Sequence, residues 1–164
     1  MDITTQQAIW LLPPALPVAL WIAYSDLKFM KITNKAVLIL VGVFVVFGLI
    51  ALPLETWLWR LSHLLIVLAI GFVASSLGLV GGGDAKYAAA IAPFVAFSDL
   101  RMVLILFAVM LLSALVVHKI AARIPAIRSR TPDWKSWSAG KDFPMGLALS
   151  GTLITYLFAG LLAG

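Results

Sequence analysis

The sequence has 164 residues, of which 63% are hydrophobic and 12% are charged, and its mean hydropathy is +1.08. Soluble domains are about half apolar and about a quarter charged, so this composition excludes an ordinary soluble protein and indicates an integral membrane protein. The net charge of +5 does not indicate a nucleic-acid partner, because the basic residues lie in loops between apolar segments, where membrane topology and anionic lipids explain them.

Residues that hold metals or cofactors are scarce. The chain has no cysteine, which excludes disulfides, thiolate chemistry and cysteine-ligated zinc. Its two histidines, His63 and His118, lie on separate apolar runs and form no ligand cluster. We therefore expect neither a metal site nor a cofactor.

The apolar runs predict an all-α polytopic fold with six transmembrane helices. A helix that crosses roughly 30 Å of hydrocarbon needs about 20 apolar residues. We expect one transmembrane domain over residues 1–164, without a soluble domain and without a cleaved signal peptide, so that the first segment stays in the membrane. The predicted segments are residues 7–24, 36–52, 58–80, 84–99, 102–121 and 144–164.

The connections between the first segments are expected to be short. Residues 25–35 are predicted to form a polar loop, and residues 55–60 an interfacial turn, since the indole rings of Trp57 and Trp59 favour the headgroup level. Small residues in the third segment would let helices approach closely. These residues are Gly71, Ser75, Ser76 and Gly78.

The fourth segment is short, because the stretch between Asp84 and Asp99 makes a helix of only about 21 Å. Charge still favours a crossing. If all six segments cross, the loops after the first, third and fifth segments share one side and leave only Arg60 and Arg101 of the basic residues opposite. Basic loops stay in the cytoplasm, so both termini are predicted outside it. Asp84 would then begin the short segment below the cytoplasmic surface.

The last of these loops, from Lys119 to Lys141, contains six of the twelve basic residues together with two prolines and two tryptophans. Such loops commonly rest on anionic lipid headgroups. A contact with a substrate or a partner is the alternative interpretation of this loop.

Two aspartates, Asp26 and Asp84, would lie together at the cytoplasmic face under this topology. Asp84 follows three glycines and could merely cap the next helix, but two carboxylates in a poorly solvated site hold one proton between them. The ionised carboxylate can then activate water while the protonated one donates to a carbonyl oxygen, which suits peptide hydrolysis without a metal or a covalent intermediate. Glycines before Asp84 would let an extended substrate strand approach closely.

The sequence GGGDAK over residues 81–86 resembles the GxGD motif of membrane aspartyl proteases, with Gly81, Gly83 and Lys86 in the motif positions around Asp84. The first loop, Asp26-Leu27-Lys28 followed by Ile32-Thr33-Asn34, is similar to the first aspartate motif of type IV prepilin peptidases. Pro144-Met145-Gly146 is similar to the start of the last helix in that family. The six-segment layout and the short chain are similar to the compact members that serve tight-adherence (Flp-type) pili.

This resemblance implies an aspartic endopeptidase with Asp26 and Asp84 as the catalytic pair. Such an enzyme lies in the bacterial inner membrane and cuts the basic leader of prepilins or pseudopilins at the cytoplasmic face. Two departures are visible. Thr33 stands where the family usually has proline, and the cytoplasmic domain with paired cysteines of the larger members is missing, so N-methylation of the mature pilin is not expected.

Two other classes of membrane protein share some of these features. A presenilin-like protease also has a GxGD motif, but it has Tyr-Asp in its first motif and Pro-Ala-Leu late in the chain, where this sequence has Ser25-Asp26 and Pro144-Met145-Gly146. A small ion or solute transporter also uses paired membrane acids. The predicted placement of both acids at one face, rather than along a path through the membrane, argues against a transporter.

Overall fold

The computed structural model describes residues 1–140 and 142–163, which fold into helices and loops without a β-strand. Lys141 and Gly164, which end the predicted basic loop and the predicted sixth segment, lie outside the described residues. The α-helices are α1 (Thr5–Phe29), α2 (Asn34–Ala51), α3 (Leu54–Ser76), α4 (Gly82–Ile91), α5 (Leu100–Ala121), α6 (Pro125–Arg130) and α7 (Met145–Leu162). The 3₁₀ helices are η1 (Ala92–Phe94), η2 (Phe97–Asp99) and η3 (Lys135–Ser138).

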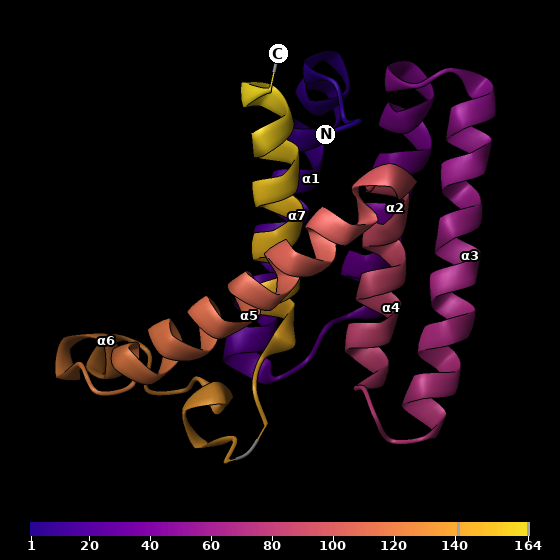
Figure 1. Ribbon diagram of the computed structural model, residues 1–164. Helices are drawn as coiled ribbons and strands as arrows, with labels where there is room; N and C mark the ends of the chain where they lie inside the picture. The colour runs from indigo at the N-terminus through magenta and orange to yellow at the C-terminus, as the bar shows by residue number, and fades with distance from the viewer. Residues whose placement is uncertain (141, 164) are drawn as a thin grey trace.

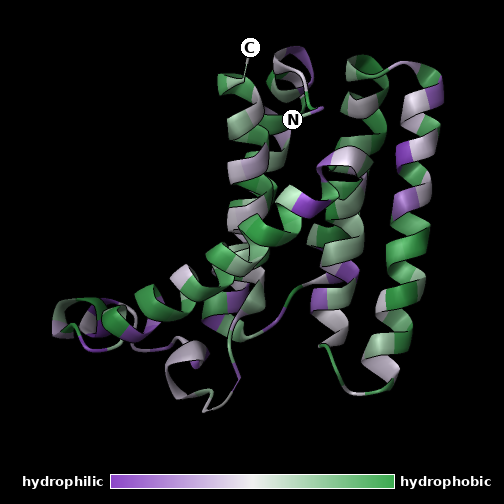
Figure 2. Cartoon of the chain, viewed as in Figure 1, coloured by the Kyte–Doolittle hydropathy of each residue, from purple (hydrophilic) through white to green (hydrophobic). Residues whose placement is uncertain are grey.

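Five stretches in the described residues are long and apolar enough to cross a membrane: α1, α2, α3, η2 continued by α5, and α7. Hydrophobic residues dominate these helices, and hydrophilic residues gather toward helix ends and loops (Figure 2). The chain is therefore a membrane protein. The predicted fourth segment is the exception, because α4 has only 10 residues before it gives way to η1 and a further break before η2.

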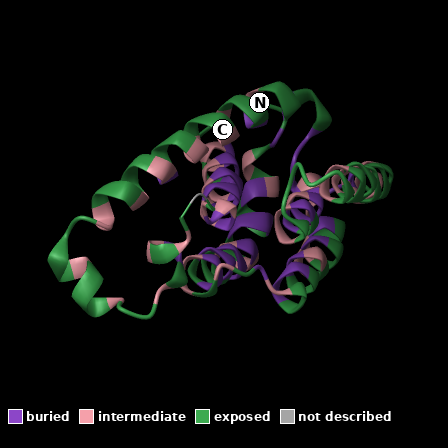
Figure 3. Cartoon of the chain, turned by 90° about the horizontal axis from the view of Figure 1, so that it is seen from below, coloured by how far each residue is buried: buried purple, intermediate pink, exposed green. Residues whose placement is uncertain are grey.

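The core of the bundle lies between α1, α2, α4 and α7 (Figure 3). α1 packs mainly against α7 and α2, and α4 packs against α3 and α2. By contrast, only 6% of the apolar windows of α3 and α5 is buried. α5 also slants away from α1 and α7, so that α6 lies beside the bundle rather than in it (Figure 1). The outer faces of α3 and α5 are thus left for lipid.

The arrangement in space groups the loops as the charge distribution predicted. The N-terminus and the end of α7 lie at one end of the bundle (Figure 1). The loops after α1 and α3 and the segment that leads into α7 lie at the other end. We refer to this second end, which contains Asp26 and Asp84, as the aspartate end.

The predicted loop over residues 25–35 is shorter than expected, because α1 and α2 extend into it and leave residues 30–33 between them. α1 continues past Tyr24 to Phe29, so Asp26 lies in its last turns and not in a loop. Met30 ends α1 in the left-handed conformation with φ of 51°, and its N–H donates to the carbonyl of Asp26. The buried Ser25 hydroxyl donates to the Lys31 carbonyl at 2.9 Å, which folds the chain back under the helix end.

The predicted interfacial turn at residues 55–60 is wrong, since α3 begins at Leu54, directly after Pro53. Arg60 is 4% exposed and reaches the Phe94 carbonyl at 3.4 Å. Trp57 packs against the core, where a methyl group on Gly48 would lie 3.1 Å from its ring. Because these two side chains point inward one turn apart, the stretch is held as helix.

Of the small residues in the predicted third segment, Gly71 and Ser75 pack closely against α4, as expected, whereas Ser76 and Gly78 are exposed and do not. A methyl group on Gly71 would lie 3.0 Å from Ala85 Cβ, so the two backbones approach at the limit that glycine allows. α3 ends at Ser76, earlier than predicted, and Gly78 turns the chain with φ of +74°. This turn delivers the glycines before Asp84 to the aspartate end.

Candidate active site

Asp26 is held in place by the start of α7. Its side chain is 5% exposed, and its Oδ2 accepts a 2.7 Å hydrogen bond from the Gly146 N–H. A methyl group on Gly146 would lie 2.8 Å from that oxygen and 3.0 Å from Asp26 Cβ, so a side chain does not fit there. Pro144, at the N-cap of α7, is also fully buried and places this turn against α1. The structure thus brings the predicted residues Asp26, Pro144 and Gly146 together.

Asp84 lies in the first turn of α4 and is partly exposed. Its Oδ2 folds back over Gly81, where a Cβ atom would lie only 2.6 Å away, so a side chain at this position would displace the carboxylate. Gly81 is the N-cap residue, and no side chain caps α4. The interpretation of Asp84 as a simple helix cap is therefore wrong. Among the described residues its carboxylate has no hydrogen-bond donor, which leaves it open for another group.

The two carboxylates lie close enough to influence each other electrostatically. Asp84 lies outside the five membrane-length helices, and its pKa is raised to about 6, first by burial and second by the negative charge of Asp26. A methyl group on Gly83 would lie 3.4 Å from Ile32 Cβ, which places the glycine loop directly against the loop after α1. The first turn of α4 and the last turns of α1 therefore form one site.

Asn34 and Lys86 join this site on the α2 side. The Lys86 ammonium donates to the Asn34 side-chain oxygen at 3.4 Å and links α4 to the first turn of α2. Thr33, which replaces the usual proline of the family, caps α2 by accepting a hydrogen bond from the Ala36 N–H at 3.4 Å. Thr33 therefore fixes the start of α2 through its side-chain cap.

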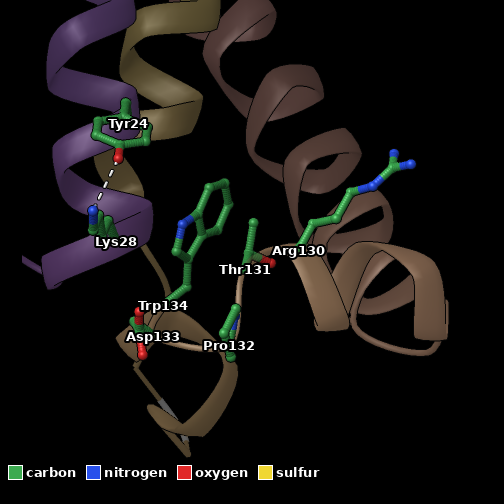
Figure 4. Close-up of a pocket in the computed structure, with 7 residues that line it drawn as sticks. All are labelled: Tyr24, Lys28, Arg130, Thr131, Pro132, Asp133 and Trp134. Atoms are coloured by element: carbon green, nitrogen blue, oxygen red, sulfur yellow. Dashed lines mark hydrogen bonds between the residues drawn. The ribbon is translucent and has the colours of Figure 1, made fainter.

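Lys28 makes its contacts away from the aspartates. It donates to the Tyr24 hydroxyl at 3.1 Å and lies over the Phe29 ring. Both Lys28 and Tyr24 line a pocket of about 260 Å³ together with Trp134, and the Arg130 guanidinium points away from the other side chains (Figure 4). No contact in the described residues joins Lys28 to the carboxylate pair, so its predicted supporting role would have to act through this pocket.

The basic segment after α5 folds over α1 through aromatic contacts. Trp134 packs edge-on against Tyr24 at 6.1 Å between ring centroids and stacks on Trp137 at 5.7 Å. Trp137 in turn stacks on His118 of α5 at 4.8 Å. This segment is thus partly an ordered part of the aspartate end and not only a solvated loop.

Two buried hydroxyl residues beneath the site were not predicted. Tyr87 is fully buried on α4, and its hydroxyl lies 2.8 Å from that of Ser150 on α7. Tyr87 follows Asp84 by one helical turn and Ser150 follows Gly146 by one turn, so helical spacing could have suggested both. Nothing in the sequence pairs them.

As for metal sites, residues 1–140 and 142–163 contain no group of three His, Asp or Glu side chains that could hold an ion.

The fold and the site define an all-helical membrane protein with paired aspartates at one end of its bundle. The sequence model of the type IV leader peptidase family matches residues 15–118, which include both aspartates. The chain belongs to this family, and the family supports a leader peptidase function. Comparisons with curated proteins and with solved structures gave no match.

Proposed function

We propose that this protein is a membrane-embedded aspartic endopeptidase that removes the basic leader peptide from prepilins or pseudopilins. The observation that carries the proposal is the pairing of Asp26, fixed by the Gly146 N–H, with Asp84, whose carboxylate is open. Family membership supplies the reaction class. We propose an Flp-type prepilin as the substrate.

The two aspartates would divide the acid and base roles according to their surroundings. Asp84, with its pKa raised to about 6, is suited to hold the shared proton and donate it to the scissile carbonyl oxygen. Asp26 keeps one oxygen on the Gly146 N–H and can take a proton from water with the other. Water then adds to the carbonyl carbon, and the tetrahedral intermediate collapses as the proton on Asp26 passes to the leaving amine.

The substrate strand would reach the pair over the glycine loop. Gly82 and Gly83 carry no side chain beside Asp84, so a peptide backbone can approach the carboxylate. The apolar outer faces of α3 and α5 leave room in the membrane for the hydrophobic helix that follows the leader in such substrates.

The decisive experiment is leader cleavage in a membrane that contains a co-expressed Flp-type prepilin. Asp26→Asn and Asp84→Asn should each abolish cleavage while the protein still inserts, because each removes one half of the acid and base pair. Asp142→Asn is the matched control, since this exposed acid lies near the aspartate end and should leave cleavage intact. Full cleavage by either of the first two variants would overturn the proposal. Solute or ion flux without cleavage would instead identify a transporter.

We also propose that the aspartate end faces the cytoplasm of a bacterial inner membrane and that residues 85–99 complete a sixth crossing. The basic loops gathered at this end support that orientation. Because the chain has no cysteine, Ser129→Cys and Thr56→Cys can report the two ends separately. A membrane-impermeant maleimide added to intact cells should label the cysteine at position 56 and not that at 129. The reverse pattern would invert the proposed orientation.

A further inference from the structure

A buried chain of hydrogen bonds ties together the three helices that carry the candidate site. The Ser150 hydroxyl on α7 donates to the Ala19 carbonyl on α1 at 2.9 Å. The same hydroxyl lies 2.8 Å from the hydroxyl of Tyr87 on α4. A serine hydroxyl has one proton, which Ser150 gives to Ala19, so Tyr87 must donate to Ser150. The direction of the chain is therefore from α4 through α7 to α1.

Each member of this chain lies on the same helix as one part of the candidate site. Tyr87 follows Asp84 by three residues, and Ser150 follows Gly146 by four. Residues at these spacings lie above one another on one helix face, and Ala19 lies two turns before Asp26 on α1. The hydrogen-bonded chain thus runs beneath the carboxylate pair.

Because both hydroxyls are buried, these hydrogen bonds restrict how the three helices can rotate and shift. Tyr87 is 0% exposed and Ser150 is 1% exposed, so neither hydroxyl can exchange its partner for water. In an apolar interior an unpaired hydroxyl is costly, and an alternative helix rotation would leave both groups without a partner. Apolar packing alone would tolerate small rotations and shifts of α4, whereas these bonds do not.

We infer that Tyr87 and Ser150 are positioning residues that fix the rotation and depth of α4 and α7 relative to α1, and thereby hold Asp84 at the distance from Asp26 that the reaction needs. The inference rests on the proposed peptidase function. Both residues act through the helices and touch neither the substrate nor the reacting atoms. Thr152 offers a contrast on α7, because its buried hydroxyl donates to the Ala148 carbonyl of its own helix and joins no other element.

The test compares Tyr87→Phe and Ser150→Ala with the control Thr152→Val. All three remove a buried hydroxyl, but only the first two break the link between helices. We expect Tyr87→Phe and Ser150→Ala to lower kcat by about tenfold to a hundredfold with little change in KM, since misplacement by about 1 Å has effects of this size. The double variant should lose no more than the worse single variant, because both break the same chain. Thr152→Val should keep its kcat.

A second readout is independent of activity. A Cβ atom on Gly83 would lie 3.4 Å from Ile32 Cβ, close to the separation that a disulfide requires, and the chain has no other cysteine. The Ile32→Cys, Gly83→Cys pair should therefore crosslink readily under mild oxidation. Added to this background, Tyr87→Phe and Ser150→Ala should slow crosslinking, and Thr152→Val should not.

Equal crosslinking rates in all three backgrounds, or a loss of kcat no greater than that of Thr152→Val, would overturn the inference. Failure of the unmodified protein to cut any prepilin would refute the proposed function. In that case the crosslinking rates would still decide whether the hydrogen-bonded chain positions α4.

Discussion

Two buried aspartates at opposite ends of the bundle have the same chemistry and different surroundings. Asp26 is 5% exposed and Asp99 is 6% exposed. Asp99 accepts hydrogen bonds from the backbone N–H groups of Asp2 and Ile3 and from the Tyr156 hydroxyl, at 2.9 to 3.3 Å. In the part of the chain that the structure describes, the Asp26 side chain accepts one hydrogen bond, from the Gly146 backbone N–H, and it lies beside a second carboxylate.

The difference shows that burial alone does not tell a structural aspartate from a catalytic one, and that the hydrogen-bond partners must be compared as well. A carboxylate in a poorly solvated place must be compensated, and Asp99 is compensated by donors on several sides and by the nearby Arg60 guanidinium. Its lone pairs are occupied, so it holds the chain terminus, η2 and α7 together. Asp26 keeps an oxygen unoccupied and shares its site with Asp84. The structure therefore assigns a structural role to the first acid, and the open pair is where we expect chemistry.

Gly146→Ala gives the largest expected effect on this comparison, because it acts on the one donor that the Asp26 side chain has among the described residues. The added methyl group would lie 2.8 Å from Oδ2, so the carboxylate or the start of α7 must move. We expect leader cleavage to fall by about a hundredfold or more, as for other displacements of about 1 Å in active sites. Cleavage rates on a purified prepilin would measure this.

Gly151→Ala is the matched control on the same helix. Its methyl group would meet only the flexible end of Met110, with Sδ at 3.4 Å, so activity should be retained. Equal activity of the two variants would show that Asp26 does not depend on its place against α7.

Asp99→Asn should have the opposite effect to Gly146→Ala: it should lower the stability of the protein and leave catalysis unchanged. The amide would turn N–H groups toward donors that now point at a carboxylate, and Arg60 would lose a nearby negative charge. Charged hydrogen bonds contribute about 1.5–3 kcal/mol each, so a loss of about 2–3 kcal/mol is expected, or roughly 5–10 °C in Tm. Thermal unfolding in detergent would measure it. Cleavage per folded molecule should stay within about twofold, and a collapse of that rate would mean that the two ends are coupled.

The sequence was enough to locate most of these elements, because long apolar runs and basic loops are direct consequences of the bilayer. The motif around Asp84 and the position of Asp26 also followed from it. The sequence could not show which faces of α1, α4 and α7 point toward one another, since a helix inside a membrane bundle is apolar on its lipid face as well as on its packing face. For this reason neither the Gly146 bond to Asp26 nor the pairing of Tyr87 with Ser150 was predicted.

The helix boundaries were wrong where polar or aromatic residues turned out to pack inward. Ser25 and Asp26 extend α1 because their side chains find partners in the Lys31 carbonyl and the Gly146 N–H. Arg60 extends α3 in the same way, through the Phe94 carbonyl. Ser25 finds its partner in the turn directly after α1, whereas Asp26 and Arg60 find theirs across the bundle. The sequence shows the residue types but not these tertiary partners.

Asp84→Asn, although it should abolish cleavage, gives the smallest expected change in stability. In the folded protein the pKa of Asp84 is raised from 3.8 to about 6, first by burial and then by the charge of Asp26, so folding favours the protonated carboxyl. Its contribution is therefore favourable at acid pH and is lost as the pH rises through about 6. Asparagine cannot ionise and avoids this loss. The two pKa values set a ceiling of about 3 kcal/mol, which solvent around the partly exposed side chain reduces to about 1–2 kcal/mol.

The inactive Asp84→Asn protein should accordingly unfold at a higher temperature than the unmodified protein at about pH 7.5. The difference should close only below the unfolded pKa of 3.8, where the carboxyl is protonated in both states. Asp99→Asn should be less stable than the unmodified protein at about pH 7.5, since the amide would turn N–H groups toward the donors of Asp2, Ile3 and Tyr156. If Asp84→Asn raises the melting temperature at about pH 7.5 and Asp99→Asn lowers it, the two aspartates differ as proposed: the ionised form of Asp84 is destabilised, and the hydrogen bonds of Asp99 are stabilising. The same sign for both at neutral pH would mean that Asp84 is stabilised as a carboxylate, and its role as the proton donor would then fail.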